Sequence, residues 1–439
     1  MDNKSLLAKL ISFQSVSTQQ QYSKQLQESV LFLQKILTEM GFKVRVIPTK
    51  KHPLLFAILD NGSSETYGFY SHYDVQPPEP LDQWKSPPFE LTETDGKLVG
   101  RGTADDKGHI AQVIFAVKQA QEKKKLNKNI FLIYEGEEEI GSQNFEPALL
   151  TIQKTLQKAD VFFILDSSTR DIETPMIEYG LRGLLYYELT VTLSHKDLHS
   201  GLYGNLVENP ANIVTQLLSS IKNIDGFVTI PHFYDTVLSP SSKEISLLKK
   251  TKPSKDQDIQ SAGVKDLVVP KGSHFALASK VLPSFDINGM ISGYTGEGAK
   301  TIIPAKASAK FSFRLVPNQD PVIIGKLFQK FVHKFFDKKT LNYKLDLLSS
   351  DFPFLTLPDN KYIHITKKVF AKHFKNETLL NRSGGSIPAA DTLSRLTKKP
   401  VVITGFTSPE SNLHSPNEFI DARLFQKGID VIFDLLTND

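Results

Sequence analysis

The sequence alternates short apolar runs with helix-length amphipathic segments, and this alternation constrains the fold more than any other feature. Leu54–Leu59, Asn129–Tyr134 and Val161–Leu165 have the length and composition of buried strands. Between them, a helical stripe of apolar residues follows Asp105–Gly108, and Phe145–Lys158 also has helical periodicity. Strands and helices that alternate in this way are typical of an α/β sheet covered by helices.

The pattern of alternating strands and helices changes after Gly180, and this change divides the chain. Leu184–Leu193 reads as a long strand rich in β-branched and aromatic residues, and the α/β pattern returns only near the C-terminus. We therefore predict a discontinuous α/β domain, formed by residues 1–178 and 353–439, with a mixed sheet flanked by helices. Residues 179–352 form a smaller inserted α+β domain.

Apolar residues at helical spacing also predict helices in both domains, whereas one long segment lacks this spacing. Residues Ser239–Ser273 are rich in Ser, Lys, Asp and Gln, and their weak apolar periodicity predicts an irregular surface region. The predicted helices are Asn209–Ile221, Lys326–Phe336, Tyr362–Phe374 and Ala422–Leu436.

Composition excludes several classes of protein. The chain has 439 residues, with 52 Lys and Arg against 48 Asp and Glu, and its net charge of +4 is too balanced for a nucleic-acid binder. No stretch approaches the roughly 20 apolar residues of a membrane span, and the first residues lack a signal peptide's apolar segment. We therefore expect a cytoplasmic protein with no nucleic-acid or membrane partner.

The absence of cysteine limits the chemistry. With no Cys in the sequence, disulfides, thiolate zinc ligands and a Cys nucleophile are all excluded. Any metal ion must therefore be held by His, Asp and Glu side chains.

Acidic and histidine residues follow several of the predicted strands. They are His72-Tyr73-Asp74, Asp105-Asp106-Lys107, Glu137–Glu139, Asp166 and His414. Each has an ordinary explanation, because carboxylates favour a helix start and three glutamates can form a solvated turn. In an open α/β sheet, however, the strand ends converge, so these residues can meet. Two histidines with several carboxylates suit one or two divalent ions such as zinc.

The same segments resemble a known family. SHYDVQP, GRGTADDKG, EGEEEIGS, ILDSS and NLHSPNE are similar, in that order, to the five metal-site motifs of the M20 metallopeptidases. KDLHSGLYGN, GEGAKTIIP, FSFRLVPNQD and GGSIP resemble the carnosinase-like dipeptidase branch. The resemblance covers nearly the whole chain and implies a split catalytic domain with an inserted lid and dimerisation domain.

The resemblance implies a ligand set for two divalent ions per subunit, most readily zinc, with manganese or cobalt as alternatives. His72, Asp105 and Asp166 would hold one ion. Asp105, Glu139 and His414 would hold the other, so that Asp105 bridges the two. The following residue, Asp106, would shape the turn through a cis peptide bond. Asp74, which is two residues past His72, would orient the site.

The resemblance also implies a mechanism. Glu138 would act as general base on a water that bridges the ions, and the water would attack the scissile amide. Glu138 would then return the proton to the leaving amine. His199 would stabilise the oxyanion from the lid domain of the partner subunit, which implies a homodimer.

Four further residues would bind the carboxylate of a small peptide: Arg314, Ser386, Gly385 and Thr301. An arginine suits this task because its fork binds a carboxylate bidentately, although Arg314 could instead be a structural ion-pair partner. The expected enzyme is a metallopeptidase that hydrolyses dipeptides or small peptides with a free C-terminal carboxylate. The alternatives are an N-acyl amino acid deacylase or desuccinylase of the same family and a catalytically silent peptide-binding homologue.

Two residues depart from the family pattern. Tyr73 stands where members often have Gly or a short aliphatic residue, and His109 stands where they often have Gly or Pro. We expect His109 to be solvated in the first turn of its helix.

Overall fold

The computed structural model describes residues 2–438 and divides into two compact units. Unit 1 contains the chain up to Tyr179, then Thr356–Asn381 and the chain from Ile387. Unit 2 contains Gly180–Leu355 and the short segment Arg382–Ser386. The sequence places that short segment in the split α/β domain, but its contacts group it with the inserted one.

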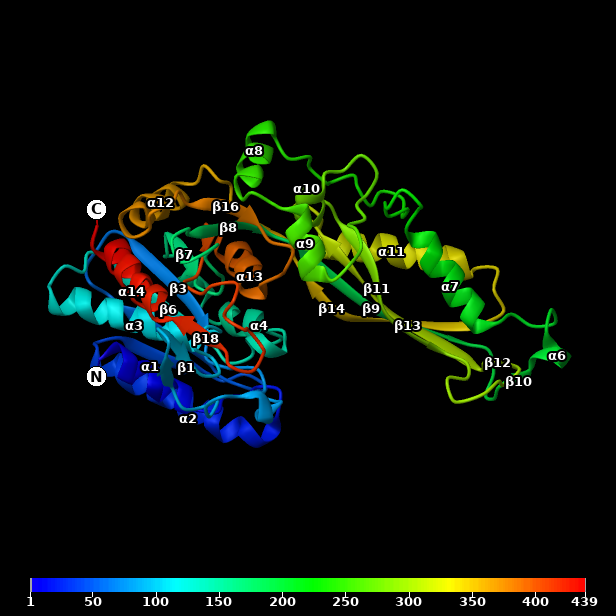
Figure 1. Cartoon of the computed structure of the whole chain (residues 1–439), viewed down its shortest axis with the longest axis horizontal. Coiled ribbons are helices and arrows are strands. Elements are labelled where there is room, and N and C mark those ends of the chain that lie inside the picture. Colours follow the sequence, from blue (N-terminus) through cyan, green and yellow to red (C-terminus); the bar gives the residue numbers. More distant parts are fainter. Residues whose placement is uncertain (1, 439) are drawn as a thin grey trace. The chain divides into compact units, whose positions relative to one another are not determined.

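Unit 1 is built on a mixed sheet (Figure 1). Strand β3 pairs in parallel with β6 and β7, and β7 pairs in parallel with β17, so these four strands end at the same edge. The pairs β1–β2, β2–β6 and β17–β8 are antiparallel. In sheet order the strands are β1 (Lys43–Ile47), β2 (Leu54–Leu59), β6 (Asn129–Glu135), β3 (Thr66–His72), β7 (Val161–Ile164), β17 (Val401–Ile403) and β8 (Met176–Leu181), with β16 (Leu379–Arg382) beside β8.

Helices cover both faces of this sheet (Figure 1), which explains why every residue of β3 is buried. Helix α3 packs against β3, α1 and α14, whereas α13 packs against β7, β17 and the helices α4 and α5. The helices are α1 (Asn3–Ser12), α2 (Ser23–Glu39), α3 (Lys107–Glu122), α4 (Phe145–Leu150), α5 (Gln153–Leu156), α12 (Lys361–His373), α13 (Pro388–Thr397) and α14 (Ala422–Thr437). A small sheet joins β4 (Thr92–Thr94), β5 (Lys97–Val99) and β18 (Phe419–Asp421).

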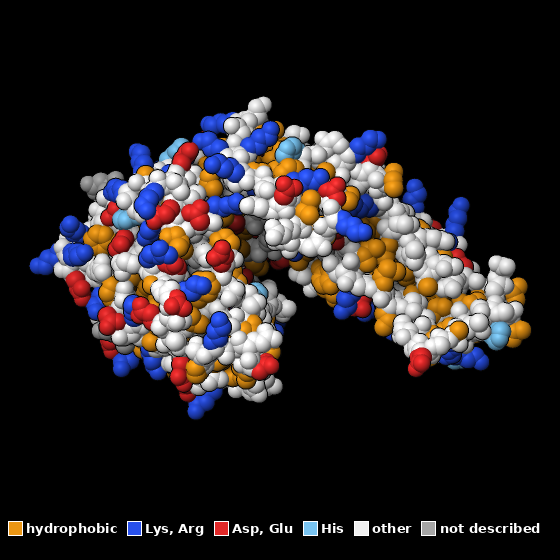
Figure 2. Space-filling view, in the orientation of Figure 1, with side chains coloured by type: hydrophobic (Ala, Val, Ile, Leu, Met, Phe, Trp, Pro, Cys, Tyr) orange, Lys and Arg blue, Asp and Glu red, His pale blue; other side chains and the backbone are white. Residues whose placement is uncertain are grey.

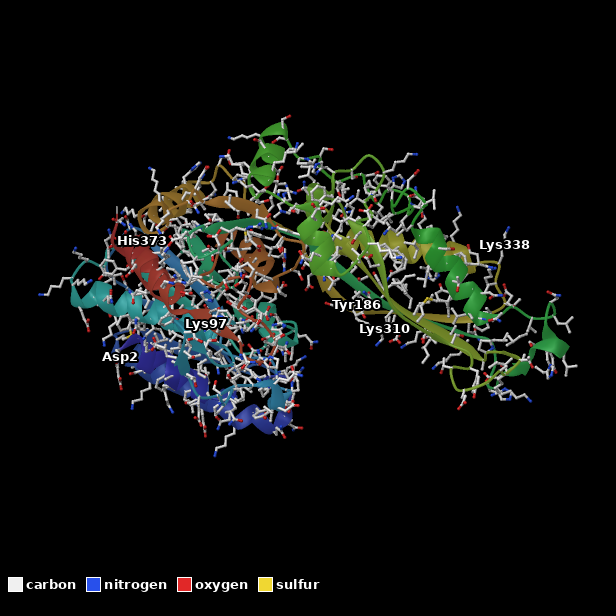
Figure 3. The ribbon with its side chains drawn as sticks, in the orientation of Figure 1. Asp2, Lys97, Tyr186, Lys310, Lys338 and His373 are labelled. Atoms are coloured by element: carbon white, nitrogen blue, oxygen red, sulfur yellow. The ribbon has the colours of Figure 1, made fainter. Side chains whose placement is uncertain are left out.

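Unit 2 contains an antiparallel sheet in the order β11-β13-β9-β14. The odd-numbered residues of β9 and β13 form a core with α7 and α11, so the even-numbered residues lie on the opposite face. Tyr186 and Lys310, labelled in Figure 3, belong to that opposite face. The strands are β9 (Gly183–Thr192), β11 (Ser284–Ser292), β13 (Lys306–Leu315) and β14 (Asn342–Asp351).

The remaining elements of unit 2 are short, apart from α7 and α11. They are the helices α6 (Ser200–Tyr203), α7 (Pro210–Ile221), α8 (Ser242–Lys250), α9 (Lys255–Ala262), α10 (Phe275–Val281) and α11 (Pro321–Phe336), and the strands β10 (Leu198–His199), β12 (Ile302–Ile303) and β15 (Phe354–Leu355).

The predicted fold class is confirmed, but three predicted segments are wrong. Residues 239–273 are irregular only in part, because they contain α8 and α9, whose starts Ser241 and Ser254 cap by accepting the backbone N–H three residues on; residues 263–273 form neither helix nor strand. Helix α11 begins five residues earlier than expected, at Pro321, since Asp320 caps it. The single helix expected over Phe145–Lys158 is two helices, α4 and α5.

The surface carries charges of both signs. Figure 2 shows Lys and Arg interspersed with Asp and Glu on the visible face of each unit. Among residues 2–438, none of the helices has the length and apolar character that crossing a membrane requires.

Candidate metal centre

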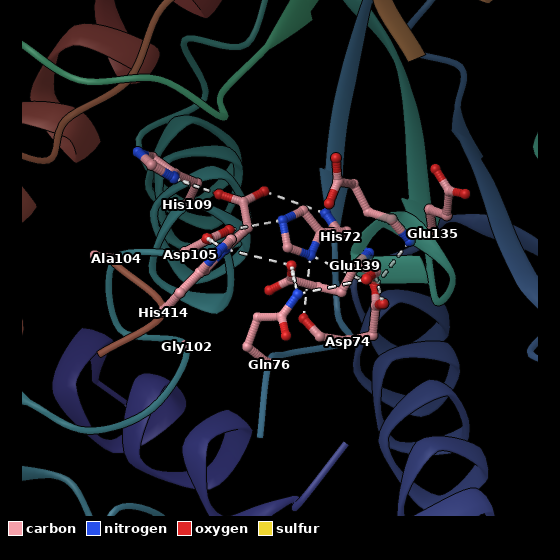
Figure 4. Close-up of polar contacts among 12 residues, drawn as sticks. His72, Asp74, Gln76, Gly102, Ala104, Asp105, His109, Glu135, Glu139 and His414 are labelled. Carbon is pink, nitrogen blue, oxygen red and sulfur yellow. Dashed lines mark hydrogen bonds and ion pairs between the residues drawn. The ribbon is translucent and has the colours of Figure 1, made fainter. Parts of the chain in front are cut away.

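The carboxyl ends of the four parallel strands bring the predicted ligands together in unit 1 (Figure 4). His72 is the last residue of β3, Glu139 follows β6, and Asp166 follows β7. His414 comes from the loop after β17, and Asp105 from the turn before α3. Convergence at this sheet edge is the reason that residues so far apart in sequence can form one site.

Asp105 is the centre of this group. Its Oδ1 lies 2.9 Å from His72 Nε2, and its Oδ2 lies 2.9 Å from His414 Nε2. Potential ligand atoms form two clusters, and within each cluster the atoms lie no more than 4.8 Å apart. One cluster contains His72, Asp105 and Asp166, and the other contains Asp105, Glu139 and His414. Asp105 belongs to both sets and presents a different oxygen to each histidine, which is an arrangement suited to a bridging ligand.

The turn that carries Asp105 is fixed by buried partners. The Asp105–Asp106 peptide bond is cis, as the family resemblance implies. Asp106 Oδ2 accepts the backbone N–H of His72 at 3.1 Å. His109 contacts Asp106 Oδ1 through Nδ1, and its Nε2 accepts the N–H of Phe406 at 2.9 Å. The expectation that His109 is solvated is therefore wrong, because this side chain is buried and links α3 to the chain after β17.

Glu418 is a site residue that the sequence reasoning missed. Its buried carboxylate accepts the backbone N–H groups of Gly102, Ala104 and Asp105 at 2.8–3.0 Å and pairs with the buried Arg101 at 2.8 Å. Glu418 thus holds the backbone of Asp105 from the far end of the chain. It is the last residue of the NLHSPNE segment, and its place in that motif was the available signal.

Asp74 connects two of the strand ends. Its carboxylate is fully buried and accepts the backbone N–H groups of Glu138 and Glu139 at 3.3 and 3.1 Å. His72 Nδ1 lies 3.1 Å from the Asp74 backbone oxygen. Gln76, a second residue missed from the sequence, donates to Glu139 Oε2 at 2.7 Å. These contacts orient the His72 ring and the turn that carries both glutamates.

Tyr73 fills space beside this turn. Its hydroxyl donates to the Pro53 backbone oxygen at 2.5 Å. A Cβ atom on Gly136 would lie only 2.3 Å from that hydroxyl oxygen. The bulky Tyr73 is therefore accommodated because the residue opposite it is glycine.

The site gathers negative charge that the protein leaves incompletely neutralised. Burial raises the pKa of Glu138 and of Asp166 well above their ordinary values, and nearby carboxylates raise them further. Burial and the neighbouring Asp105 raise the pKa of Glu139 to about 7. Burial alone would also raise the pKa of Asp105, but hydrogen bonds with His414 and His72 outweigh it and lower that pKa.

In unit 2, Arg314, Gly385 and Ser386 belong to one neighbourhood. The Arg182 backbone N–H donates to the Gly385 oxygen at 3.1 Å, and Arg182 Nε donates to the Gly384 oxygen at 3.1 Å. Burial and the nearby positive charge of Arg314 lower the pKa of Arg182 to about 10. Arg182, which the sequence reasoning missed, thus lies between Arg314 and the Gly385 backbone.

His199 and Thr301 lie at the other end of unit 2. His199 pairs with Ile302 in the β10–β12 ladder, next to Thr301. Strand β13 begins at Lys306, three residues after Ile303 of this ladder, and its eight residue steps from Lys306 to Arg314 span about 26 Å at about 3.3 Å per residue. A dipeptide extends only about 7 Å, so one copy of unit 2 cannot hold it at both ends.

Comparison with known proteins identifies the family. Residues 68–438 match the model of peptidase family M20/M25/M40. The chain belongs to peptidase family M20. It is 29% identical to the Cys-Gly metallodipeptidase dug1 of Schizosaccharomyces pombe, over 96% of this chain and 92% of that protein. It is 30% identical to the human Beta-Ala-His dipeptidase, over 84% of this chain and 74% of that protein.

A solved M20 structure has the same fold. The M20 family metallo-carboxypeptidase Sso-CP2 from Sulfolobus solfataricus superimposes with a TM-score of 0.87 and 31% identity, over 100% of this chain and 99% of that one. The predicted recognition of the family and of a peptidase is therefore confirmed.

The donor atoms of this M20 site fit divalent cations. Three carboxylates and two imidazoles provide oxygen and nitrogen ligands in two clusters that share Asp105. Glu139 Oε1 is buried and has no hydrogen-bond partner among the described residues. A cation would satisfy this atom and relieve the repulsion among the carboxylates.

We predict that the metal-free protein loses stability as the pH rises from 4.5 to about 7. The pKa of Glu139 rises from the ordinary 4.5 to about 7 on folding, so in this window the folded state keeps a proton that the unfolded state has lost. The free energy of unfolding therefore falls with rising pH. The raised pKa values of Glu138 and Asp166 also make the free energy of unfolding fall as the pH rises.

The measurement is the Tm of chelated and zinc-loaded protein across this pH range. The chelated protein should show the larger decrease, and Glu139→Gln should reduce the slope in the chelated protein. A chelated Tm that rises from pH 4.5 to about 7 would contradict the charge balance of the site.

Proposed function

We propose that this M20 peptidase is a metal-dependent dipeptidase that hydrolyses dipeptides or small peptides with a free C-terminal carboxylate. The observation that carries the proposal is the pair of ligand clusters sharing Asp105, with the carboxylate of Glu138 beside them and in neither. The names of two relatives, a Cys-Gly metallodipeptidase and a Beta-Ala-His dipeptidase, support small dipeptides as the substrate class.

Five residues would hold two divalent ions, most readily zinc, with manganese or cobalt as alternatives. His72 and Asp166 belong to one cluster, Glu139 and His414 to the other, and Asp105 to both. Bound ions would polarise the scissile carbonyl and lower the pKa of water at the site. The buried Asp74 would keep His72 and Glu139 in place through the contacts described above.

Glu138 would act as the general base. It is adjacent to the proposed ligand Glu139, and its backbone N–H is held by Asp74. Its raised pKa suits a group that takes a proton from the attacking water and later gives it to the leaving amine. Both transfers need the carboxylate to remain free of the metal, and Glu138 is in neither ligand cluster.

Unit 2 would bind the substrate carboxylate. Arg314 lies on the face of the sheet opposite the core with α7 and α11, and Gly385 lies near it through Arg182, with Ser386 next in the chain. The guanidinium of an arginine, with a serine hydroxyl near it, suits a carboxylate. Thr301 precedes β13, of which about 26 Å separates Lys306 from Arg314, so we assign Thr301, with His199, to the site of a partner subunit.

A homodimer through unit 2 would supply these residues. Strand β11 is an edge strand with exposed Ile287, Met290 and Ile291. A groove of about 410 Å³ lies between α7 and β11. An exposed apolar sheet edge favours pairing with a second chain, and a second copy offers the same edge. The imidazole of His199, which is exposed, would then stabilise the oxyanion in the partner's site.

Two other functions remain as alternatives within this fold. An N-acyl amino acid deacylase or desuccinylase would use the same ligands, because these do not specify the acyl group. A catalytically silent peptide-binding protein is disfavoured since Glu138 and all five proposed ligands are present. The cytoplasmic location stays a prediction.

The test of substrate class is a zinc-reconstituted assay on dipeptides, tripeptides and N-acyl amino acids. We expect the highest kcat/KM on dipeptides with a free C-terminal carboxylate, and low activity on their amides, because the carboxylate would lose its contact with Arg314. Activity on N-acyl amino acids alone would replace the dipeptidase by the deacylase. Release of C-terminal residues from long peptides would indicate a carboxypeptidase.

Glu138→Ala should keep both metal ions and lower kcat by about 10²- to 10⁴-fold, because it removes the base without removing a ligand. Elemental analysis measures the metal content, and a kinetic assay on the best dipeptide measures kcat. Glu39→Ala, which changes an exposed carboxylate at the end of α2, is the matched control and should leave both unchanged. Full activity of Glu138→Ala would disprove its role as base.

Mixing inactive His199→Ala with inactive Glu138→Ala should restore activity if His199 acts across subunits. At equal amounts half of the dimers are mixed, and one of the two sites in each is complete, so about a quarter of wild-type activity is expected. Either variant alone is the control. Mixed dimers that are verified by differential tagging but remain inactive would place His199 in the site of its own chain.

A further inference from the structure

The segment Ser383–Ser386, here called the carboxylate loop, is held from two sides within unit 2. On one side lies Arg182, whose backbone N–H and Nε bond to Gly385 and Gly384. The Ser383 N–H donates to the Gly180 oxygen at 2.8 Å. These hydrogen bonds, which lie near Arg314, fix the distance of the carboxylate loop from the sheet.

The other side is formed by residues that the proposed function leaves without a role. Arg382, which immediately precedes the loop, forms an ion pair with Glu244 of α8. The Arg382 side chain is 9% exposed and that of Glu244 is 15% exposed. A pair this deeply buried is desolvated, so its attraction is screened less than that of a surface pair.

Helix α8 is built to present Glu244. Ser241 caps the helix by accepting the Glu244 backbone N–H at 3.2 Å, which sets Glu244 in the first turn. Leu248, one turn later, is buried. The side chain of Glu244 therefore leaves a fixed helix start.

Packing leaves little room for the loop to move. A Cβ atom on Gly180 would lie 3.1 Å from Arg382 Cγ, so the arginine stem packs on the backbone of β8. A Cβ atom on Gly384 would lie 3.1 Å from Arg182 Nη2 and 3.4 Å from the Ser279 backbone oxygen of α10. The loop is thus enclosed by Arg182, by α10 and, through Arg382, by α8 (elements in Figure 1).

We propose that Glu244, through its ion pair with Arg382, is a positioning residue for the carboxylate loop and sets the affinity for the substrate carboxylate. The inference rests on the proposed function, because it assumes that Gly385 and Ser386 contact that carboxylate. Helix α8 then contributes to substrate specificity through the ion pair of Glu244 with Arg382. A shift of the loop weakens ground-state and transition-state binding alike, so it changes KM and leaves kcat nearly constant.

The experiment compares Glu244→Gln, Arg382→Gln and the double variant with the wild type. Glu244→Gln keeps the shape of the side chain and removes its charge. We expect KM for a dipeptide to rise about tenfold, with kcat within about twofold, since misplacement by about 1 Å has effects of this order or larger. The KM of the double variant should be no higher than that of Arg382→Gln alone, because both changes break the same ion pair.

Two controls separate positioning from general destabilisation. Asp266→Asn removes the exposed Lys255–Asp266 pair of the same segment, with N···O distance 2.6 Å, and should leave KM unchanged. A dipeptide amide lacks the carboxylate, so its KM should not change in Glu244→Gln. Equal increases in KM for the dipeptide and its amide would show a merely structural effect and overturn the proposal.

Binding to the Glu138→Ala protein distinguishes failure of this inference from failure of the proposed function. Calorimetry with an unhydrolysed dipeptide should show a Kd about tenfold higher when Glu244→Gln is added. An unchanged Kd, with active wild type, overturns the positioning role alone. A raised Kd with a wild type that hydrolyses no dipeptide overturns the dipeptidase and keeps the positioning role.

Discussion

The contact on which the site depends is that of one carboxylate, Asp105, with two histidines from opposite ends of the chain. Its two oxygens lie 2.9 Å from His72 and His414, and the surrounding structure serves to keep them there. Glu418 holds the Asp105 backbone, and Asp106 holds that of His72. Burying so much like charge is costly unless it is compensated. The architecture of unit 1 is therefore arranged around a charge that the protein alone does not balance, as expected for a metal enzyme.

Parallel pairing explains why these residues meet. Strands β6, β3, β7 and β17 end at one edge, and each is followed by a residue of the site. The helices on both faces bury the strands, so only the loops at their ends are free to carry polar groups. In unit 2 the sheet is antiparallel and covered on one face, which leaves Arg314 on the other face. The two units thus provide different kinds of surface, a charged strand edge and an open sheet face.

Much of this could be predicted from the sequence, and the failures have physical reasons. Apolar runs located the central strands, and the order of the motifs located His72, Asp105 and His414. Most partners of Glu418 are backbone N–H groups, which no side-chain pattern encodes, so its place in the NLHSPNE segment was the only signal for it. His109 was misplaced since a polar residue at a helix start is usually solvated, whereas Asp106 and Phe406 satisfy both of its nitrogens here. Helix α8 was missed because its caps, not apolar periodicity, define it.

The separation of the proposed substrate residues within unit 2 is the argument for the homodimer that we propose. Arg314 lies near the end of β13, about 26 Å from Lys306 at its start, whereas His199 belongs to the β10–β12 ladder that precedes this strand, yet both would act on one small substrate. Arg314 is held in the four-stranded sheet through the pairing of β13 with β9, whereas His199 is held in the separate β10–β12 sheet. In the proposed dimer, a second copy related by a two-fold axis would supply His199 to the site that contains Arg314 of the first copy. In such a dimer, the length of β13 would set the distance between Arg314 and the end of unit 2 that carries His199.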